Sequence, residues 1–189
     1  MEQKIYLKFS HPGARESLLS WWEELDCARG DRAALRHCHN PLEVAFTPAF
    51  HRLKMRLEPF GSINQDKMVQ LAIVAGVLSH VKKNKSAGQE SDFRKSFAVQ
   101  MASPSSKRGA GKKACVSNMR FRQLLKIEDP DKLFTTMIRL VRLLEGSVDI
   151  VSLANGIYWW NDCTKNGCTK KEWAYAYYEH APSEEKLGV

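Results

Sequence analysis

Four residues between Pro130 and Leu144 have the types and the spacing to bind an anion together. Lys132, Thr135, Arg139 and Arg142 follow one another at steps of three, four and three, which places them along one line of an α-helix. No acidic residue interrupts that line. Such a cationic stripe suits the regularly spaced charges of a nucleic-acid backbone. It is also typical of a merely solvated helix face, and that alternative stays open.

The charge of the whole chain favours a polyanionic partner. Its 189 residues contain 29 Lys and Arg against 21 Asp and Glu, a formal net charge of +8, which suits nucleic acid. A membrane surface is the competing polyanion, but no apolar run approaches the roughly 20 residues that span a bilayer. The start, MEQKIYLKFSHPG, lacks the apolar core and cleavage site of a signal peptide. We therefore expect a soluble, cytoplasmic protein with no membrane partner.

Apolar periodicity predicts the helices that position these residues. Leu133, Met137, Leu140 and Val141 recur at three- and four-residue steps and would form the buried side of a helix over about 130–144, with Asp129 as its N-cap. Similar patterns predict helices at about 16–28, 31–38, 48–58, 68–81, 93–101, 117–127, 150–161 and 169–180. Because no convincing series of strands is found, the sequence predicts an all-α helical bundle.

The lengths and composition of the segments predict a single domain, residues 1–189, made of two small packed helical lobes at about 14–101 and 114–181. A basic loop at about 102–113 would join them. This loop resembles a phosphate-binding loop only superficially, because Ser106 and Lys113 stand where that motif needs glycine and Ser or Thr. Pro41 and Pro48 are expected to bracket an irregular link.

The sequence gives little support for a metal site, a disulfide framework or a catalytic site. Five cysteines at irregular spacing predict free thiols rather than a disulfide framework. Neither Cys27 with His37, Cys38 and His39, nor Cys163 with Cys168, has the repeated close pairs of a zinc site. No nucleophile, base or acid cluster has catalytic spacing. We expect no metal, no cofactor and no enzyme activity. The aromatic residues near the C-terminus are expected to face the core rather than stack on bases; they are Trp173, Tyr177 and Tyr178.

Several motifs, taken in order, resemble a known family. PAFHRL is followed by PFG, then by RFRQLLKIEDPDKLFTTMIRLVRLL and IYWW. This order is similar to that of the small subunit of the type I-E CRISPR surveillance complex, the CasB family of Cascade. The resemblance extends over about 18–178. It implies an all-helical, non-catalytic subunit that is present in two copies packed head to tail. Its implied partners are the backbone and large subunits of the crRNA-guided complex, crRNA, target DNA and the displaced strand.

The resemblance also implies a set of basic residues that hold DNA, while pairing with the guide supplies sequence recognition. Arg36 and Arg52 match the N-terminal motifs, and Lys67 lies close to the basic position after PFG. Together with the cluster that Arg32 forms with Arg36, the residues expected to bind nucleic acid are Arg32, Arg36, Arg52, Lys67, Arg120, Arg122, Lys126, Arg139 and Arg142. The alternative function is that of a basic helical assembly protein that binds acidic protein partners.

Overall fold

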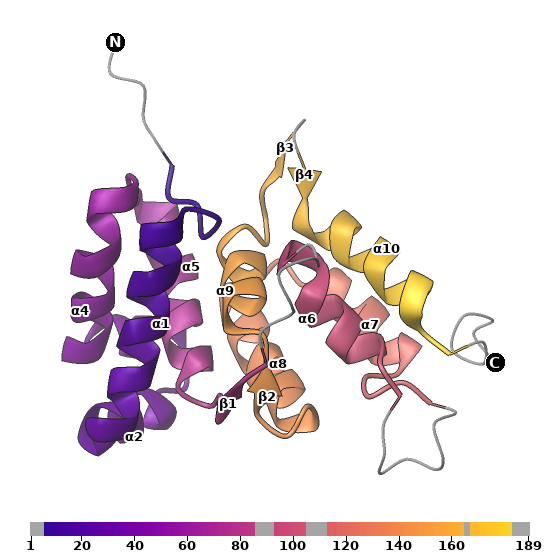
Figure 1. Cartoon of the computed structure of the whole chain (residues 1–189), viewed down its shortest axis with the longest axis horizontal. Helices are drawn as coiled ribbons and strands as arrows, with labels where there is room; N and C mark the ends of the chain where they lie inside the picture. The colour runs from indigo at the N-terminus through magenta and orange to yellow at the C-terminus, as the bar shows by residue number, and fades with distance from the viewer. Residues whose placement is uncertain (1–5, 86–92, 105–112, 165–166, 183–189) are drawn as a thin grey trace.

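The structure is a computed structural model that describes residues 6–85, 93–104, 113–164 and 167–182. Helices make up most of the described chain (Figure 1), and the fold is the all-helical bundle that the sequence predicts. The helices are α1 (Pro12–Cys27), α2 (Arg29–His37), α3 (Pro41–Ala45), α4 (Pro48–Leu57), the 3-10 turn η1 (Glu58–Phe60), α5 (Gln65–Leu78), α6 (Phe93–Ala102), α7 (Asn118–Leu125), α8 (Pro130–Leu143), α9 (Ile150–Tyr158) and α10 (Thr169–His180).

The strands of the described chain are two-residue pairs. β1 (Lys83–Asn84) runs parallel to β2 (Ser147–Val148), and β3 (Cys163–Thr164) runs antiparallel to β4 (Gly167–Cys168). Strands this short cannot form a sheet with a core of its own. They fix connections between helices.

Local sequence signals explain most helix boundaries. Asp129 is the N-cap of α8, as predicted, because its Oδ1 accepts a hydrogen bond from the backbone N–H of Lys132 at 2.8 Å. Thr47 caps α4 in the same way through the N–H of Phe50. In both helices a proline follows the cap, at the position where its missing N–H costs nothing.

The prediction of an irregular link between Pro41 and Pro48 is wrong. Pro41–Ala45 forms α3, and the side chain of Asn40 accepts from the N–H of Glu43 at 2.9 Å. A capping asparagine followed by proline and, three residues after the cap, by an acid is a helix start signal. The helix is only five residues long, too short for apolar periodicity to reveal.

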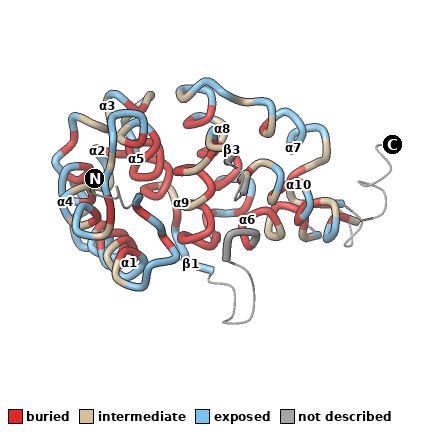
Figure 2. Tube along the Cα trace, turned by 90° about the horizontal axis from the view of Figure 1, so that it is seen from above, coloured by how far each residue is buried: buried red, intermediate tan, exposed pale blue. Residues whose placement is uncertain are grey.

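The core is built around α5, which is buried on all sides from Leu71 to Leu78, as expected of a helix that is apolar all round. It packs against α3, α8 and α9. Figure 2 shows this burial continuing from α5 into α9. Helices of the N-terminal half therefore share one hydrophobic core with helices of the C-terminal half.

Helix α6 packs mainly against α10 and α9, and in Figure 1 it lies between them. The predicted lobes assigned residues 93–101 to the N-terminal lobe, whereas these contacts join that segment to the C-terminal helices. The central part of the predicted basic loop, residues 105–112, lies outside the described residues.

The expectation of free thiols holds for Cys27, Cys38 and Cys115 and is wrong for Cys168, which is disulfide-bonded. The Cα register of β3 and β4 sets Cys163 opposite Cys168. Spacing alone did not indicate this, because the hairpin that opposes the two positions has no strong strand signal in the sequence.

Candidate nucleic-acid interface

A groove of about 570 Å³ lies between α7 and α8. It brings three of the predicted cations together, Arg120 from α7 and Arg139 and Arg142 from α8. All three residues are exposed. The rest of its lining is Gln123, Leu124, Ile127, Thr136, Leu140 and Leu143. Two of the three arginines are those of the stripe that the spacing on α8 predicts.

The two walls of the groove follow the same order of residue types. On α7 and the turn after it, Arg120 and Gln123 are followed by Leu124 and Ile127. On α8, the corresponding series is Thr136, Arg139, Leu140 and Leu143. Both series have steps of three, one and three, which place their members on one side of a helix. Each wall therefore carries polar and apolar side chains. The accessible apolar ones are half-buried Ile127 and 36% exposed Leu143, whereas Leu124 and Leu140 are buried.

The connector between the two helices is fixed by the end of α9 and the start of α10. The indole Nε1 of buried Trp160 donates to the backbone oxygen of Ile127 at 2.8 Å. The ammonium of Lys170 donates to the same oxygen at 3.0 Å, and burial lowers the pKa of Lys170. Asn161 donates from Nδ2 to the backbone oxygen of Glu128. These bonds hold α7 and α8 in a fixed relation.

Aromatic side chains of α10 hold the start of α7. Phe121 stacks on Tyr177, with ring centroids 4.0 Å apart, and the hydroxyl of Tyr177 donates to the backbone oxygen of Val116 at 2.6 Å. Tyr178 donates to Oδ1 of Asn118. Trp173 and Tyr177 are fully buried, and Tyr178 packs against the core. The prediction that these aromatic residues face the core is confirmed.

The cations of the groove are not neutralised by the described residues. Within the described ranges, no carboxylate lies within ion-pair distance of Arg120, Arg139 or Arg142, whereas the ion pairs of those ranges use other cations. Three guanidinium groups around one concavity give a positive potential that carboxylates do not cancel, and this attracts an anionic ligand.

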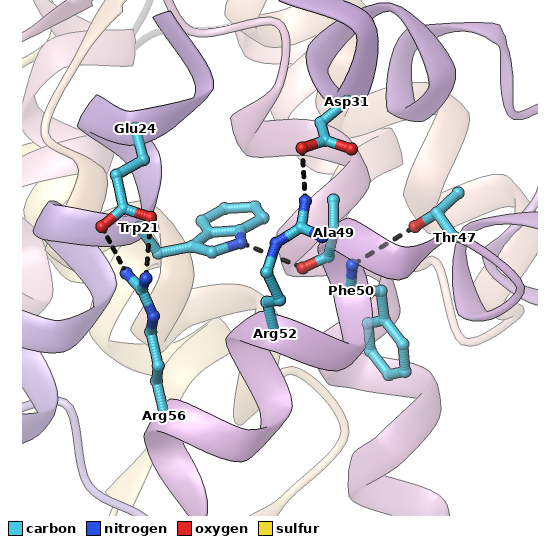
Figure 3. A network of polar contacts seen from close by, with 8 residues as sticks. All are labelled: Trp21, Glu24, Asp31, Thr47, Ala49, Phe50, Arg52 and Arg56. Carbon is cyan, nitrogen blue, oxygen red and sulfur yellow. Dashed lines mark hydrogen bonds and ion pairs between the residues drawn. The ribbon is translucent and has the colours of Figure 1, made fainter. Parts of the chain in front are cut away.

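Two N-terminal candidates, Arg52 and Arg32, form ion pairs with acidic residues of the same chain. Arg52 pairs with Asp31 beside a second pair, Arg56 with Glu24, which has two hydrogen bonds of 2.9 and 2.7 Å (Figure 3). The Arg56 bond also holds the pKa of Glu24 below its usual value.

Arg32 is paired with Asp26 and lies over the ring of Trp22 at 5.7 Å, with only 12% of its side chain exposed. The structure therefore uses Arg32 and Arg52 to join helices. Both stay proposals as nucleic-acid contacts.

Arg36, another predicted candidate, binds the C-terminal end of α5. Its Nε donates to the backbone oxygen of Ser79, the C-cap of α5, at 2.8 Å, a favourable place for a cation. The next residue, His80, is close enough to both Arg142 and Arg36 for their charges to act on it. Burial first, and then these two cations, lower the pKa of His80 to about 4. His80 therefore stays neutral at neutral pH, near both Arg36 and Arg142 of the groove.

Lys67 is placed differently from the other candidates. It is 8% exposed, and its ammonium donates to the backbone oxygen of Tyr158 at 2.8 Å and pairs with Asp162 at 2.5 Å. It also lies 4.1 Å from the ring centroid of Trp159. These contacts join α5 to the end of α9. These contacts indicate that Lys67 stabilises the fold. A role of Lys67 in binding nucleic acid remains a prediction.

Arg122 and Lys126 are exposed on and after α7 but do not line the groove, and neither does Lys132 of the predicted stripe. Sequence reasoning missed Gln123 and Thr136, which do line it. The groove residues of the two segments have the same spacing, but this spacing identifies Gln123 and Thr136 only when α7 and α8 are known to be neighbours.

Among the residues that the structure describes there is neither a candidate metal centre nor a membrane-spanning helix. There, no group of three or more His, Cys, Asp or Glu side chains could hold a metal ion. No helix in those ranges is long and apolar enough to cross a membrane.

Comparison with known proteins decides the family. The model of the CRISPR-associated protein Cse2 family matches residues 31–178. The chain belongs to this family. The match confirms the resemblance to the CasB small subunit, because it includes the groove helices and most of the motifs that carry the resemblance.

A solved structure has a similar fold. One chain of E. coli Cascade, in a crystal structure bound to a PAM-containing double-stranded DNA target, superposes on this Cse2 protein with a TM-score of 0.58. The two chains are 20% identical, and the match covers 88% of this chain and 97% of that one. Comparison with curated proteins gives no match.

Proposed function

We propose that this chain is a non-catalytic small subunit of a type I-E CRISPR surveillance complex, where its cationic surface holds target DNA and the displaced strand of the R-loop. Its partners are then the backbone and large subunits of the crRNA-guided complex, crRNA, target DNA and a second copy of itself. The chain supplies phosphate contacts, and pairing with the guide supplies sequence recognition.

The observation that carries the proposal is the groove between α7 and α8. Arg120, Arg139 and Arg142 meet there from two helices, without a carboxylate partner among the described residues. Cations kept for the fold are paired, as Arg52 and Arg56 are with Asp31 and Glu24. Exposed, unpaired cations contribute little to stability, so their gathering at one concavity is better explained by a polyanionic ligand.

The family and the fold support the same function. The Cse2 family is CRISPR-associated, and the similar chain belongs to a Cascade complex that is bound to a DNA target. The fixed connector between α7 and α8 adds a mechanical reason. Since Trp160 and Lys170 hold it at Ile127, the backbone that carries the arginines is held in place, so binding has to order only their side chains.

The direct test compares the reconstituted surveillance complex with and without this chain. We expect the complex that contains the chain to release target DNA more slowly. Because phosphates are neutralised when it binds, the stabilisation should decrease as the salt concentration rises and should be similar for different target sequences. Dissociation of labelled target DNA at several salt concentrations measures this directly.

A complex whose copy of this chain carries Arg139→Ala with Arg142→Ala separates the alternative, an assembly protein for acidic partners. If the alternative holds, the complex fails to assemble without the chain, and the assembled variant complex releases DNA at the wild-type rate. DNA or RNA cleavage that requires this chain, lost when one of its acidic residues is replaced, would contradict the non-catalytic proposal.

A further inference from the structure

The groove between α7 and α8 has features that phosphate binding alone does not require. Phosphates stay partly solvated and require only donors on an exposed surface. This groove is instead a hollow of about 570 Å³ in which solvent reaches two apolar side chains, half-buried Ile127 and 36% exposed Leu143, while Leu124 and Leu140 are buried. A hollow of this size that combines apolar side chains with polar groups suits a small ligand that has an apolar face and a polar edge.

The polar groups of the hollow suit a nucleobase. Gln123 offers an amide and Thr136 a hydroxyl, and these groups donate to and accept from the edge of a base. Guanidinium planes such as those of Arg120 and Arg139 stack on bases in place of aromatic side chains. The accessible apolar side chains of Ile127 and Leu143 would cover part of one face of a base, while the arginines reach the phosphates on either side.

The concave shape further selects the kind of nucleic acid. Bases within a duplex are stacked and paired, so they cannot enter a hollow in a protein surface, whereas bases of a single strand can be turned outward. An acidic protein segment would satisfy the arginines but would leave Ile127 and Leu143 uncovered unless it also inserted an apolar side chain. The combination of cations with accessible apolar side chains therefore favours a single-stranded nucleic acid.

We propose that the groove formed by Arg120, Ile127, Thr136, Arg139 and Leu143 seats an unstacked base of a single strand, so that this surface discriminates single-stranded from double-stranded nucleic acid. The inference rests on the proposed function, because it assumes that the groove arginines contact nucleic acid. It adds that a base enters the site.

The first experiment needs no substitution. The full-length protein is titrated with a fluorescently labelled oligo-thymidine strand, with a strand of equal length that carries abasic sites, and with a duplex. The phosphates of the two single strands are the same. We expect the strand with bases to bind about tenfold more tightly than the abasic strand, a difference in the range that stacking of a base produces. The duplex should bind more weakly than the strand with bases.

The second experiment fills the hollow without changing its charge. Thr136→Phe places a ring in the groove, and Met119→Phe is the control because Met119 of α7 is 72% exposed and does not line the groove. Thr136→Phe should bind both single strands with the affinity of the abasic strand, whereas Met119→Phe should keep the preference of the wild type. Circular dichroism checks that both variants stay helical.

The outcomes distinguish this inference from the proposed function. Equal affinity of the wild type for the two single strands, with a steep salt dependence, would overturn base seating and leave phosphate binding in place. No affinity for any of the three probes, either by the protein or by the assembled complex, would overturn both. Loss of assembly with partner subunits in Thr136→Phe, at unchanged DNA affinity, would assign the groove to a protein segment instead.

Discussion

At the scale of single residues, ion pairing separates the cations that join helices from those that we propose to bind nucleic acid. Arg52 and Arg56 find carboxylates on other helices, while Arg139 and Arg142 line the groove. The sequence shows where every basic residue lies, but it does not show which of them form ion pairs. The acid that pairs with Arg52 lies 21 residues away, and the one that pairs with Arg56 lies 32 residues away.

The environment of His80 predicts how stability depends on pH. Its pKa falls from 6.5 to about 4 in the folded chain. Between these values the unfolded chain binds a proton that the folded chain does not, so the free energy of unfolding decreases as the pH falls. Relative to about pH 7.5, the loss at about pH 5 should be on the order of 1 to 2 kcal/mol from this residue.

Urea unfolding at the two pH values measures the effect. His80→Gln should show a smaller loss of stability at acidic pH than the wild type, because the substituted side chain does not titrate. His37→Gln, at an exposed position near the end of α2, is the control and should keep the wild-type dependence. Identical pH dependence in wild type and His80→Gln would show that His80 is not held neutral by its surroundings.

At the scale of secondary structure, the sequence predicted what periodicity and capping encode. The helix at α8 begins and ends within a residue of the predicted range, since Asp129, Pro130 and the apolar spacing all specify it. The five-residue helix α3 was not predicted, because a single helical turn is too short to show apolar periodicity. The β1–β2 pair was not predicted either, because it joins Lys83 to Ser147, a pairing that no local pattern encodes.

The approach of α8 to α5 depends on a glycine. A Cβ added at Gly76 would lie 2.4 Å from Cε2 of Phe134 and 2.9 Å from Cγ2 of Val44, both in the core. Gly76→Ala should therefore destabilise the protein by about 1 to 3 kcal/mol, because overpacking outweighs the gain in helix propensity. Thermal or chemical unfolding measures the change.

Gly30→Ala is the matched control for this helix contact. Gly30 is in the first turn of α2, where an added Cβ meets nothing within 4 Å, so the same substitution should be neutral or stabilise by up to about 1 kcal/mol. If Gly76→Ala were as stable as Gly30→Ala, α5 and α8 would pack less closely than the structure indicates.

At the scale of the whole molecule, the net charge of +8 predicted a polyanionic partner but not where it binds. The groove exists because α10 and the end of α9 hold α7 and its connector beside α8. Contacts between segments 33 to 61 residues apart create this arrangement. The sequence could therefore predict the stripe on α8, and the family resemblance could predict Arg120, but only the fold places the three arginines around one hollow.

The proposal that these arginines hold DNA is tested most directly by the salt dependence of target-DNA binding to the reconstituted complex. In the variant with both Arg139→Ala and Arg142→Ala, affinity should fall to a similar extent for different target sequences. The slope of log affinity against log salt should become shallower by roughly 1.4 to 1.8, since each neutralised phosphate contributes about 0.7 to 0.9. The fold should remain intact because exposed arginines contribute little to stability.

The charge-matched control is Arg15→Ala with Lys54→Ala, which removes two cations from α1 and α4, on the far side of the molecule from α7 (Figure 1). It should leave both the affinity and the salt slope close to those of the wild type. A double variant of Arg139 and Arg142 that binds target DNA with unchanged affinity and unchanged salt slope would contradict the assignment of this groove as the DNA-binding surface.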